Sequence, residues 1–333
     1  KSIYSFPIQI DEMIKQYESY KLKNRYTEIN NILVLGMGGS AIGAEICQAL
    51  IKDKCSVPII VNRNYIIPNW VNSKTLVIAS SYSGETEETI EAYSKTIELT
   101  KNIIIVSTGG VLSQMGNDNN HDVFIIPKSY QPRAAIGYSV MSILFMLIRL
   151  NIIDSLILNE IKKIIGSLLD YSDDLSRVSN KNQAMLFSEK ILNTVPVIYG
   201  SSLGTEVVAL RFKGQLQENS KIIAYHNIVP EMNHNEIEGW NLVNNNKNNN
   251  FSVIWLHDRN DHQQINKRMI ICKELLENMN IKNYTLEVNG STFTERLFKL
   301  IVLTDWISFY LAIRNNIDPS PVKTISKLKD RLK

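Results

Sequence analysis

A run of hydroxyl side chains around one glycine is the first feature of this sequence that could do chemistry. Residues 80–86 read Ser-Ser-Tyr-Ser-Gly-Glu-Thr, after a short apolar run at 75–79 and before a stretch that favours a helix. Where a strand enters a helix through such a turn, backbone N–H groups and hydroxyls converge, and the helix dipole favours negative charge. Gly84 allows a ligand to approach the backbone closely. Without the Lys of a nucleotide-binding loop, the turn predicts a site for a small phosphate ester, although Ser83 is also typical of an ordinary helix cap.

Two stretches in the second half could move protons. The first ends with Glu218, and the second, at 231–240, reads Glu-Met-Asn-His-Asn-Glu-Ile-Glu-Gly-Trp. A carboxylate at a helix end can act as a general base, and a His between Asn and Glu has partners that fix its tautomer. A metal site is the alternative for the second stretch, but one His without helical His-x-x-x-His spacing is a poor zinc pattern. Solvated surface positions are the other alternative for Glu218 and His234.

Arg133 is the candidate cation for binding an anion. It follows a proline in the segment 129–137, which reads Ser-Tyr-Gln-Pro-Arg-Ala-Ala-Ile-Gly and leads into an apolar helix from Tyr138. A guanidinium at the mouth of a buried helix could face an anion near the strand ends. The alternative is an exposed loop cation.

A glycine-rich turn at 36–43 offers a second interpretation of the first half. Its glycines are similar to a dinucleotide-binding fingerprint, but their spacing differs from that motif. The next strand ends Asn-Arg-Asn at 62–64, with no acidic residue to hold a ribose. The sequence therefore disfavours a nicotinamide cofactor.

Short apolar runs alternate with helix-forming stretches through the first half, and these elements must position the candidate residues. Such alternation through Gly-bearing loops predicts a doubly wound parallel sheet. The expected strands are residues 31–36, 58–62, 76–79, 102–106 and 123–126, and the expected helices include 10–20, 44–51 and one that starts at Glu87.

The same pattern begins again at Val195. Residues 195–206 mirror residues 34–45 with one offset, which matches Gly39 to Gly200 and Ser40 to Ser201. This repeat predicts an α/β protein of two flavodoxin-like, doubly wound domains that arose by internal duplication. The predicted organisation is an N-terminal domain at 1–150, a helical linker at 151–190 and a C-terminal domain at 191–333, which includes helices at 293–314 and from Val322.

The two halves differ where the candidate phosphate site lies. The strand at 252–256 is followed by His-Asp-Arg-Asn-Asp at 257–261, an acidic loop without Gly or the hydroxyl cluster. Carboxylates there would repel phosphate, so we expect one phosphate site per chain, in the first half. An Asn-rich run at 244–250 is expected to be an exposed loop.

Composition excludes several classes of protein. Of 333 residues, 44% are hydrophobic and 21% are charged, and the net charge of +3 without a basic stripe disfavours a nucleic-acid partner. Cys47, Cys55 and Cys272 form no Cys-x-x-Cys pair, so we expect no disulfide framework, no zinc and a cytoplasmic location. The most apolar segment, 140–148, is shorter than the roughly 20 residues that span a bilayer, so we expect no membrane partner.

Six stretches together carry a family resemblance. In chain order they are Gly36-Met-Gly-Gly-Ser-Ala-Ile-Gly, Ser81-Tyr-Ser-Gly-Glu-Thr-Glu-Glu-Thr, Pro132-Arg-Ala-Ala-Ile-Gly-Tyr-Ser, Gln217-Glu-Asn-Ser-Lys, Glu231-Met-Asn-His-Asn-Glu and Leu328-Lys329. In this order they resemble the bifunctional phosphoglucose/phosphomannose isomerase family, which is built from two sugar-isomerase domains. The resemblance covers the chain from about residue 30 to its end.

The resemblance implies a set of substrate-binding residues. The 6-phosphate of a sugar would be held by hydroxyls and one backbone amide, and Gly39 would also contact the substrate. The residues implied for the phosphate are Ser40, Ser81, Ser83, Thr86 and the amide of Gly84.

The resemblance also implies how the reaction proceeds. Glu218 would take the C2 proton and return it to C1 through a cis-enediol, and Arg133 would stabilise charge on the enediolate oxygens. His234 and Lys329 would open the sugar ring. Lys323 and Lys327 compete with Lys329 for this match, which we assign to Lys329 because of its Leu-Lys setting.

The implied assembly is a homodimer in which His234 reaches the active site of the neighbouring subunit. No metal and no organic cofactor would be needed, because the reaction consists of proton transfers. Acceptance of mannose 6-phosphate would depend on a hydroxyl near C2, for which Ser320 and Thr324 are both candidates.

Two other functions compete with this one. An enzyme restricted to glucose 6-phosphate would use the same residues, and a non-catalytic sugar-phosphate sensor would keep only the phosphate site. The presence of Glu218, Arg133 and His234 argues against the sensor, as does the lack of a helix-turn-helix pattern in the sequence.

Overall fold

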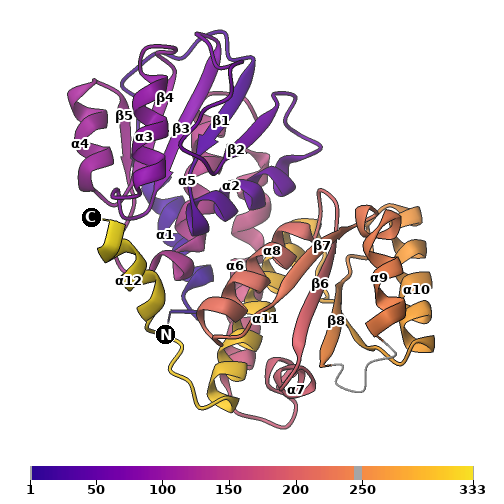
Figure 1. Cartoon of the computed structure of the whole chain (residues 1–333). Helices are drawn as coiled ribbons and strands as arrows, with labels where there is room; N and C mark the ends of the chain where they lie inside the picture. The colour runs from indigo at the N-terminus through magenta and orange to yellow at the C-terminus, as the bar shows by residue number, and fades with distance from the viewer. Residues whose placement is uncertain (1, 244–249, 333) are drawn as a thin grey trace. The chain divides into compact units, whose positions relative to one another are not determined.

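The computed structural model of the chain describes residues 2–243 and 250–332. These residues form two compact units, Lys1–Leu169 and Asp170–Lys333, each built around its own parallel sheet (Figure 1). The expected loop at 244–250 lies, apart from Asn250, outside the described residues. No helix among the described residues combines the length and apolar character needed to cross a bilayer.

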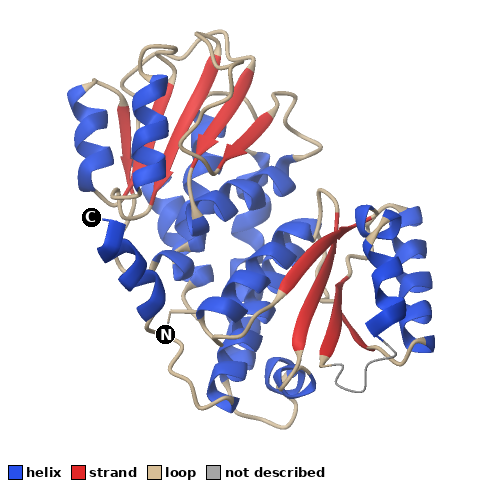
Figure 2. Ribbon diagram, viewed as in Figure 1, coloured by secondary structure: helices blue, strands red, loops and turns tan. Residues whose placement is uncertain are grey.

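The sheet of the first unit has five strands in the order β2-β1-β3-β4-β5, and all neighbouring pairs are parallel. Its central strands are buried along almost their whole length, as expected for apolar runs that helices cover on both faces. The strands are β1 Asn31–Leu35, β2 Ile59–Asn62, β3 Thr75–Ser81, β4 Ile103–Ser107 and β5 Asp122–Ile125 (Figure 2). The helices are α1 Phe6–Ser19, α2 Gly38–Ile51, α3 Glu87–Thr96, α4 Gly110–Asp118, the short 3₁₀ helix η1 Pro132–Ala134 and α5 Ile136–Arg149.

Different helices cover the two faces of this sheet (Figure 1). On one face, Val77 of β3 packs with Tyr93 of α3 and Leu112 of α4 in a single core cluster. On the other face, α2 and α5 approach so closely that a Cβ at Gly43 would overlap the side chain of Ser139. The sheet is therefore fixed from both sides, and the loops at its carboxyl edge start from a rigid base.

The sheet of the second unit repeats this strand order, because β7-β6-β8-β9 corresponds to β2-β1-β3-β4. Its neighbouring pairs are also parallel. The predicted fold class, two doubly wound α/β domains related by duplication, is confirmed. The strands are β6 Val195–Ser201, β7 Tyr225–Val229, β8 Phe251–Leu256 and β9 Lys282–Leu286. The helices are α7 Gln183–Lys190, α8 Glu206–Glu218, the 3₁₀ helix η2 Glu231–His234, α9 Glu236–Val243, α10 Gln263–Asn278, α11 Phe293–Arg314 and α12 Lys323–Leu332.

In the second unit, α9 and α10 cover one face of the sheet, and α8 and α11 cover the other (Figure 1). Tyr199 and Trp255 of the strands share a core cluster with Trp240 of α9 and Met269 of α10. α6 (Leu156–Ser176) begins in the first unit and ends in the second. The stretch between the two sheets is thus helical in α6 and α7.

Some boundaries differ from those expected from the sequence. α2 begins at Gly38 rather than Ala44, because its glycines are contact positions and not helix breakers: a Cβ at Gly39 would lie 2.8 Å from the carbonyl oxygen of Pro132. α5 begins at Ile136 rather than Tyr138. β7 is absent from the expected strands, since it is an edge strand whose first four residues are at least partly exposed and show no apolar run.

Candidate active site

The loops that follow β1 and β3 begin close together, because these strands are neighbours and Leu35, the last residue of β1, pairs with Ala79, two residues before the end of β3. Residues 81–86, called the hydroxyl loop below, connect β3 to α3. Inside this loop the backbone N–H of Tyr82 donates to Ser40 Oγ, in the first turn of α2, at 3.3 Å. At one edge of the sheet, Ser40 therefore meets the loop that carries Ser81, Ser83, Gly84 and Thr86, the other residues predicted to bind phosphate.

The hydroxyl loop is organised by its own side chains. Ser81 Oγ accepts a hydrogen bond from the N–H of Gly84 at 3.1 Å and lies 2.8 Å from Thr86 Oγ1. Ser83 Oγ accepts from the N–H of Glu85 at 3.2 Å. Ser81 is only 1% exposed, whereas Ser83 is exposed and Thr86 is half-buried. The loop thus has a buried hydroxyl that fixes its shape and two accessible hydroxyls at its surface.

Gly84 is required by the conformation of this loop. Its φ is +71°, in the region that side chains other than glycine disfavour. A Cβ at this position would overlap the carbonyl oxygen of Gly109, in the loop between β4 and α4. Glu85 reinforces this contact, since its Oε1 accepts from the N–H of Val111 at 3.0 Å. The hydroxyl loop is therefore pressed against the next loop of the sheet.

Among the described residues, neither Ser83 nor Thr86 acts as an ordinary helix cap for α3. Thr86 is the N-cap residue of α3, and its side chain makes no capping hydrogen bond to the helix. Ser83 bonds to Glu85, which precedes the helix. The N-terminus of α3 therefore keeps donor groups and a partial positive charge, which is the arrangement that favours an anion.

Arg133 lies in the turn at residues 131–135, called the arginine turn below, and two contacts place this turn next to the phosphate-binding candidates. Gly39, in the first turn of α2, packs directly against Pro132. The hydroxyl of Tyr82 donates to Pro127 O at 3.2 Å and accepts from the N–H of Tyr130 at 3.1 Å, which ties the hydroxyl loop to the segment before the turn. The first unit therefore gathers Gly39, Ser40, the hydroxyl loop and the arginine turn.

In the second unit, Glu218 is the last residue of α8, and the chain that follows it is fixed to α11. Asn219 Nδ2 donates to Ser308 Oγ at 2.9 Å, and Ser220 Oγ donates to the carbonyl oxygen of Ser308 at 2.6 Å. Both Asn219 and Ser220 are buried. These two bonds hold the backbone at Glu218, whose side chain is half-buried.

We expect Ser308→Ala to lower the free energy of unfolding by about 1–3 kcal/mol, because it removes a buried hydrogen bond between the side chains of Asn219 and Ser308. Chemical denaturation of both proteins measures this difference. Ser94→Ala is the matched control, since the exposed Ser94 hydroxyl donates to a carbonyl oxygen of its own helix, and we expect a change below about 0.5 kcal/mol. Equal stabilities of Ser308→Ala and the wild type would contradict the anchoring role.

Glu218 lines a groove of about 740 Å³ in the second unit, called the carboxylate groove below. Lys323 and Thr324, from the first turn of α12, line the same groove. Lys221 Nζ donates to the carbonyl oxygen of Glu218, which adds a positive charge at the end of α8. The other candidates, Lys327, Lys329 and Ser320, are exposed and do not line this groove.

His234 closes η2 and is exposed, while the residues before it are anchored. Met232 is fully buried in the core of the second unit. Asn233 Nδ2 lies 2.9 Å from Cys272 Sγ on α10. Together these contacts hold the short helix against the unit and leave the imidazole of His234 facing solvent.

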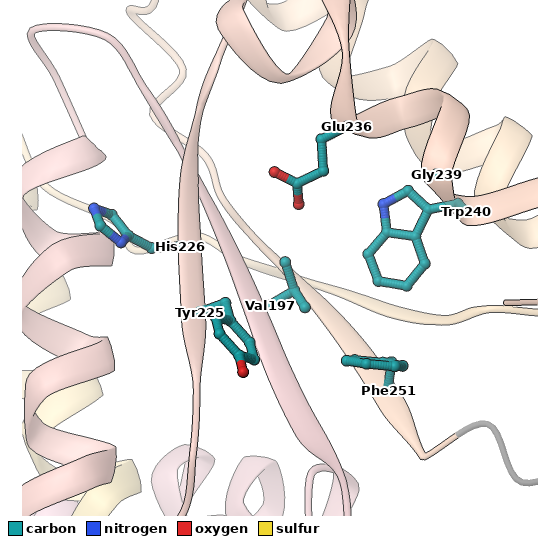
Figure 3. Close-up of a pocket in the computed structure, with 7 residues that line it drawn as sticks. All are labelled: Val197, Tyr225, His226, Glu236, Gly239, Trp240 and Phe251. Carbon is teal, nitrogen blue, oxygen red and sulfur yellow. The ribbon is translucent and has the colours of Figure 1, made fainter.

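Glu236, two residues after His234, anchors the start of α9. Tyr199 Oη donates to Glu236 Oε1 at 2.6 Å, Asn227 Nδ2 donates to Oε2, and Trp240 Nε1 donates to Tyr199 Oη at 3.0 Å. Figure 3 shows this carboxylate projecting over the sheet beside Trp240, at a pocket of about 350 Å³. Burial, with the hydrogen bond to Glu236, raises the pKa of Tyr199, so its hydroxyl stays protonated and can donate.

The remaining carboxylates near His234 bond to neighbouring amides. Asn235 Nδ2 donates to Glu231 Oε1 at 3.2 Å, and Asn241 Nδ2 donates to Glu238 Oε1 at 2.9 Å. Within the part of the chain that the structure describes, no three His, Cys, Asp or Glu side chains are grouped so that they could hold a metal ion.

The position in the second unit that corresponds to the hydroxyl loop contains carboxylates. Asp261 Oδ1 accepts from Ser201 Oγ, at the end of β6, at 2.8 Å. Asp258 is buried and paired with Arg296, with the two Asp258 oxygens 2.7 and 2.9 Å from guanidinium nitrogens. An anion would meet negative charge here, so this loop contrasts with the hydroxyl loop in the first unit.

Sequence reasoning missed the residues that hold the site together. Tyr82, Asn219 and Ser220 lie inside the quoted motifs but were not singled out. The available signal was a polar residue beside buried apolar sequence, which in a folded protein needs a hydrogen-bonding partner.

Comparison with known proteins points to one family. A family model described as "Bacterial phospho-glucose isomerase C-terminal SIS domain" matches residues 180–332. A protein from Caldicellulosiruptor bescii, named bifunctional phosphoglucose/phosphomannose isomerase, is 39% identical over 335 residues, which cover 100% of this chain and 98% of the relative. A protein of the same name from Aquifex aeolicus is 30% identical over 97% of each chain.

Solved structures agree on the fold. The C-terminal domain of glucosamine-fructose-6-phosphate aminotransferase from Francisella tularensis matches with a TM-score of 0.76, over 96% of this chain and 97% of that domain. The sequence identity is 15%, so this likeness supports the architecture alone.

Proposed function

Since this chain belongs to the bifunctional phosphoglucose/phosphomannose isomerase family, we propose that it interconverts glucose 6-phosphate, mannose 6-phosphate and fructose 6-phosphate. The observation that carries this proposal is the hydroxyl loop. It presents hydroxyls and backbone N–H groups at an uncapped helix N-terminus without any Lys, which suits the phosphate of a small sugar ester.

Phosphate binding is the first part of the proposed mechanism. The hydroxyls of Ser40, Ser83 and Thr86 donate to the phosphate oxygens, and Gly84 brings its backbone close to them. Ser81, which accepts from the amide of Gly84, keeps the loop in shape from below. Gly39 contacts the substrate through its backbone. Phosphate binding fixes the sugar, so that C1 and C2 keep the positions that the proton-transfer groups require.

Proton transfer is the second part. His234 and Lys329 open the sugar ring, Glu218 moves a proton between C2 and C1, and Arg133 stabilises the negative charge of the enediolate. The cis-enediol is planar at C2, so glucose 6-phosphate and mannose 6-phosphate share one intermediate. No metal ion and no organic cofactor takes part in this scheme.

The test is to offer purified protein fructose 6-phosphate with EDTA present and to follow both aldose phosphates in separate coupled assays. We expect both products to form. Glucose 6-phosphate alone would restrict the activity to the narrower isomerase. If neither product formed while fructose 6-phosphate still raised the melting temperature, the protein would be a sensor and the role of Glu218 would be wrong.

We expect Thr86→Val to raise KM for fructose 6-phosphate roughly 10- to 100-fold and to change kcat less, because it removes one hydrogen bond to a charged phosphate. Thr89→Val, one turn further along α3, is the matched control. The Thr89 hydroxyl is buried and has no hydrogen-bond partner among the described residues, so its loss leaves KM unchanged. Steady-state kinetics of the two variants decide the point, and equal KM values would contradict phosphate binding by Thr86.

We also propose a homodimer in which His234 serves the active site of the partner subunit. The exposed His234 on an anchored η2 supports this, because it projects from the surface of its own unit. The protein is proposed to work in the cytoplasm, in keeping with the free thiols of Cys47, Cys55 and Cys272.

Mixing two inactive variants tests the shared site. When Glu218→Gln and His234→Ala proteins exchange subunits, each hybrid dimer regains one intact site, so we expect about a quarter of the wild-type activity. Each variant incubated alone is the control. No recovered activity after confirmed subunit exchange would place His234 in the active site of its own subunit.

A further inference from the structure

A buried polar residue on the N-terminal helix touches the turn that carries Arg133. Gln9 of α1 is 0% exposed and lies among buried apolar residues of the same helix, Phe6, Ile10 and Met13. A buried amide costs free energy unless both of its ends are hydrogen-bonded. The position of Gln9 therefore needs an explanation in terms of its partners.

The amide of Gln9 spans the junction between η1 and α5. Its Nε2 donates to the carbonyl oxygen of Ala134 at 2.7 Å, and its Oε1 accepts from the N–H of Gly137 at 3.0 Å. The same Nε2 lies 2.9 Å from Ser5 Oγ, so the amide itself is held in place. One side chain thus binds the backbone on both sides of Ala135 and Ile136, directly after Arg133.

This contact replaces a helix cap that the local sequence does not supply. Ala135 is the N-cap residue of α5 and has no side chain that could accept a hydrogen bond. Gln9 provides the acceptor instead, from a position 128 residues away in the sequence. Gly137 permits the approach, since a Cβ there would lie 2.8 Å from Gln9 Cβ.

A fixed turn matters for the chemistry because electrostatic stabilisation depends on geometry. A guanidinium must already point to the place where negative charge develops in the transition state. A misplacement of about 1 Å from a change outside the reacting groups can cost roughly 100-fold in rate. Arg133 is attached to a turn whose backbone is gripped by Gln9 at its far end and by Tyr82 ahead of it.

We propose that Gln9 is a positioning residue, which holds the arginine turn so that Arg133 stabilises the enediolate. The proposal rests on the role of Arg133 proposed above. It differs from a role in helix packing alone, because packing between α1 and α5 also involves other contacts, such as the hydrogen bond from the Tyr138 hydroxyl to Glu12.

A double-mutant cycle tests this proposal. Gln9→Met keeps the size of the side chain and removes its hydrogen bonds, and we expect kcat for fructose 6-phosphate to fall roughly 10- to 100-fold with KM within about threefold. In an Arg133→Ala background the same change is expected to cost less than about twofold, because Gln9 acts through Arg133. Gln9→Glu, which keeps the acceptor for Gly137, replaces Gln9→Met in the cycle if the latter does not fold.

Tyr138→Phe is the matched control, since it removes a hydrogen bond between α1 and α5 and leaves the hydrogen bonds of Gln9 to Ala134 and Gly137 in place. We expect a lower melting temperature and an unchanged kcat. Equal losses from the Gln9 change in both backgrounds, or a loss that Tyr138→Phe reproduces, would overturn the positioning role. If Arg133→Ala itself left kcat unchanged, the proposed role of Arg133 would fail instead, so the two failures are distinguishable.

Discussion

Glu218→Gln is expected to lower kcat for fructose 6-phosphate by about 10³-fold, within the ~10²–10⁴-fold range of general acid–base catalysis. The substitution keeps the shape of the side chain but removes its ability to accept a proton. Because Asn219 and Ser220 hold the end of α8 through buried bonds to Ser308, the backbone at Glu218 is expected to stay in place. KM should therefore change by less than about threefold.

Steady-state kinetics and a thermal melt of the same preparation measure both expectations. Glu238→Gln is the matched control, because Glu238 is exposed on α9 and its interaction with Asn241 needs only an acceptor oxygen, which Gln retains. This control should have wild-type kcat. A Glu218→Gln protein with more than about a tenth of the wild-type kcat would contradict the assignment of the base.

Gly84→Ala is expected to raise KM for fructose 6-phosphate by roughly 100-fold or more. The new methyl group meets the carbonyl oxygen of Gly109 and sits on a backbone with φ of +71°, so the hydroxyl loop has to move. Displacement of the loop loses at least two charge-assisted hydrogen bonds to phosphate, each of about 1.5–3 kcal/mol. The rise in KM should be larger than that caused by removing any single hydroxyl of the loop.

Gly166→Ala is the matched control for this change. Gly166 is exposed on α6, and a Cβ there meets no atom of the described residues within 4 Å. Alanine in a helix should stabilise the protein by up to about 1 kcal/mol and leave KM unchanged. A wild-type KM in Gly84→Ala would show that the hydroxyl loop does not bind the phosphate.

The architecture was predictable because buried parallel strands appear in a sequence as short continuous apolar runs. β1, β3 and β4 all have this form, and their burial in the structure accounts for it. β7 was not predicted, because an edge strand does not need an apolar run. Tyr225 is exposed, and His226 and Asn227 are half-buried. Because the second half of the chain repeats the first, a strand equivalent to β2 could still have been expected at residues 225–229.

The start of α2 shows a second limit of reasoning from local preference. Glycine disfavours helices, so Gly38, Gly39 and Gly43 argued for a loop. In the structure, Gly39 and Gly43 allow α2 to pack against the arginine turn and α5 without a steric clash. A tertiary contact therefore outweighed a propensity of about 1 kcal/mol for each glycine.

The candidate catalytic and binding residues could be predicted from the sequence, but the residues that anchor them could not. Thr86 and Arg133 stand in recognisable motifs, and Glu218 stands at a predicted helix end. Their anchors lie far away in the chain, since Gln9 bonds to a residue 128 positions later and Asn219 to one 89 positions later. The spacing of residues within a motif cannot predict partners that lie so far away in the sequence.

The most direct test of the central claim is to incubate the enzyme with glucose 6-phosphate in D₂O and to locate deuterium in the products by NMR. Proton transfer through a shared cis-enediol predicts that part of the fructose 6-phosphate carries deuterium at C1 and that mannose 6-phosphate gains deuterium at C2, while the fraction that Glu218 returns before exchange keeps the original hydrogen. A Glu218→Gln protein that formed the same labelled products at the wild-type rate would contradict the mechanism, because the proton would then not pass through Glu218.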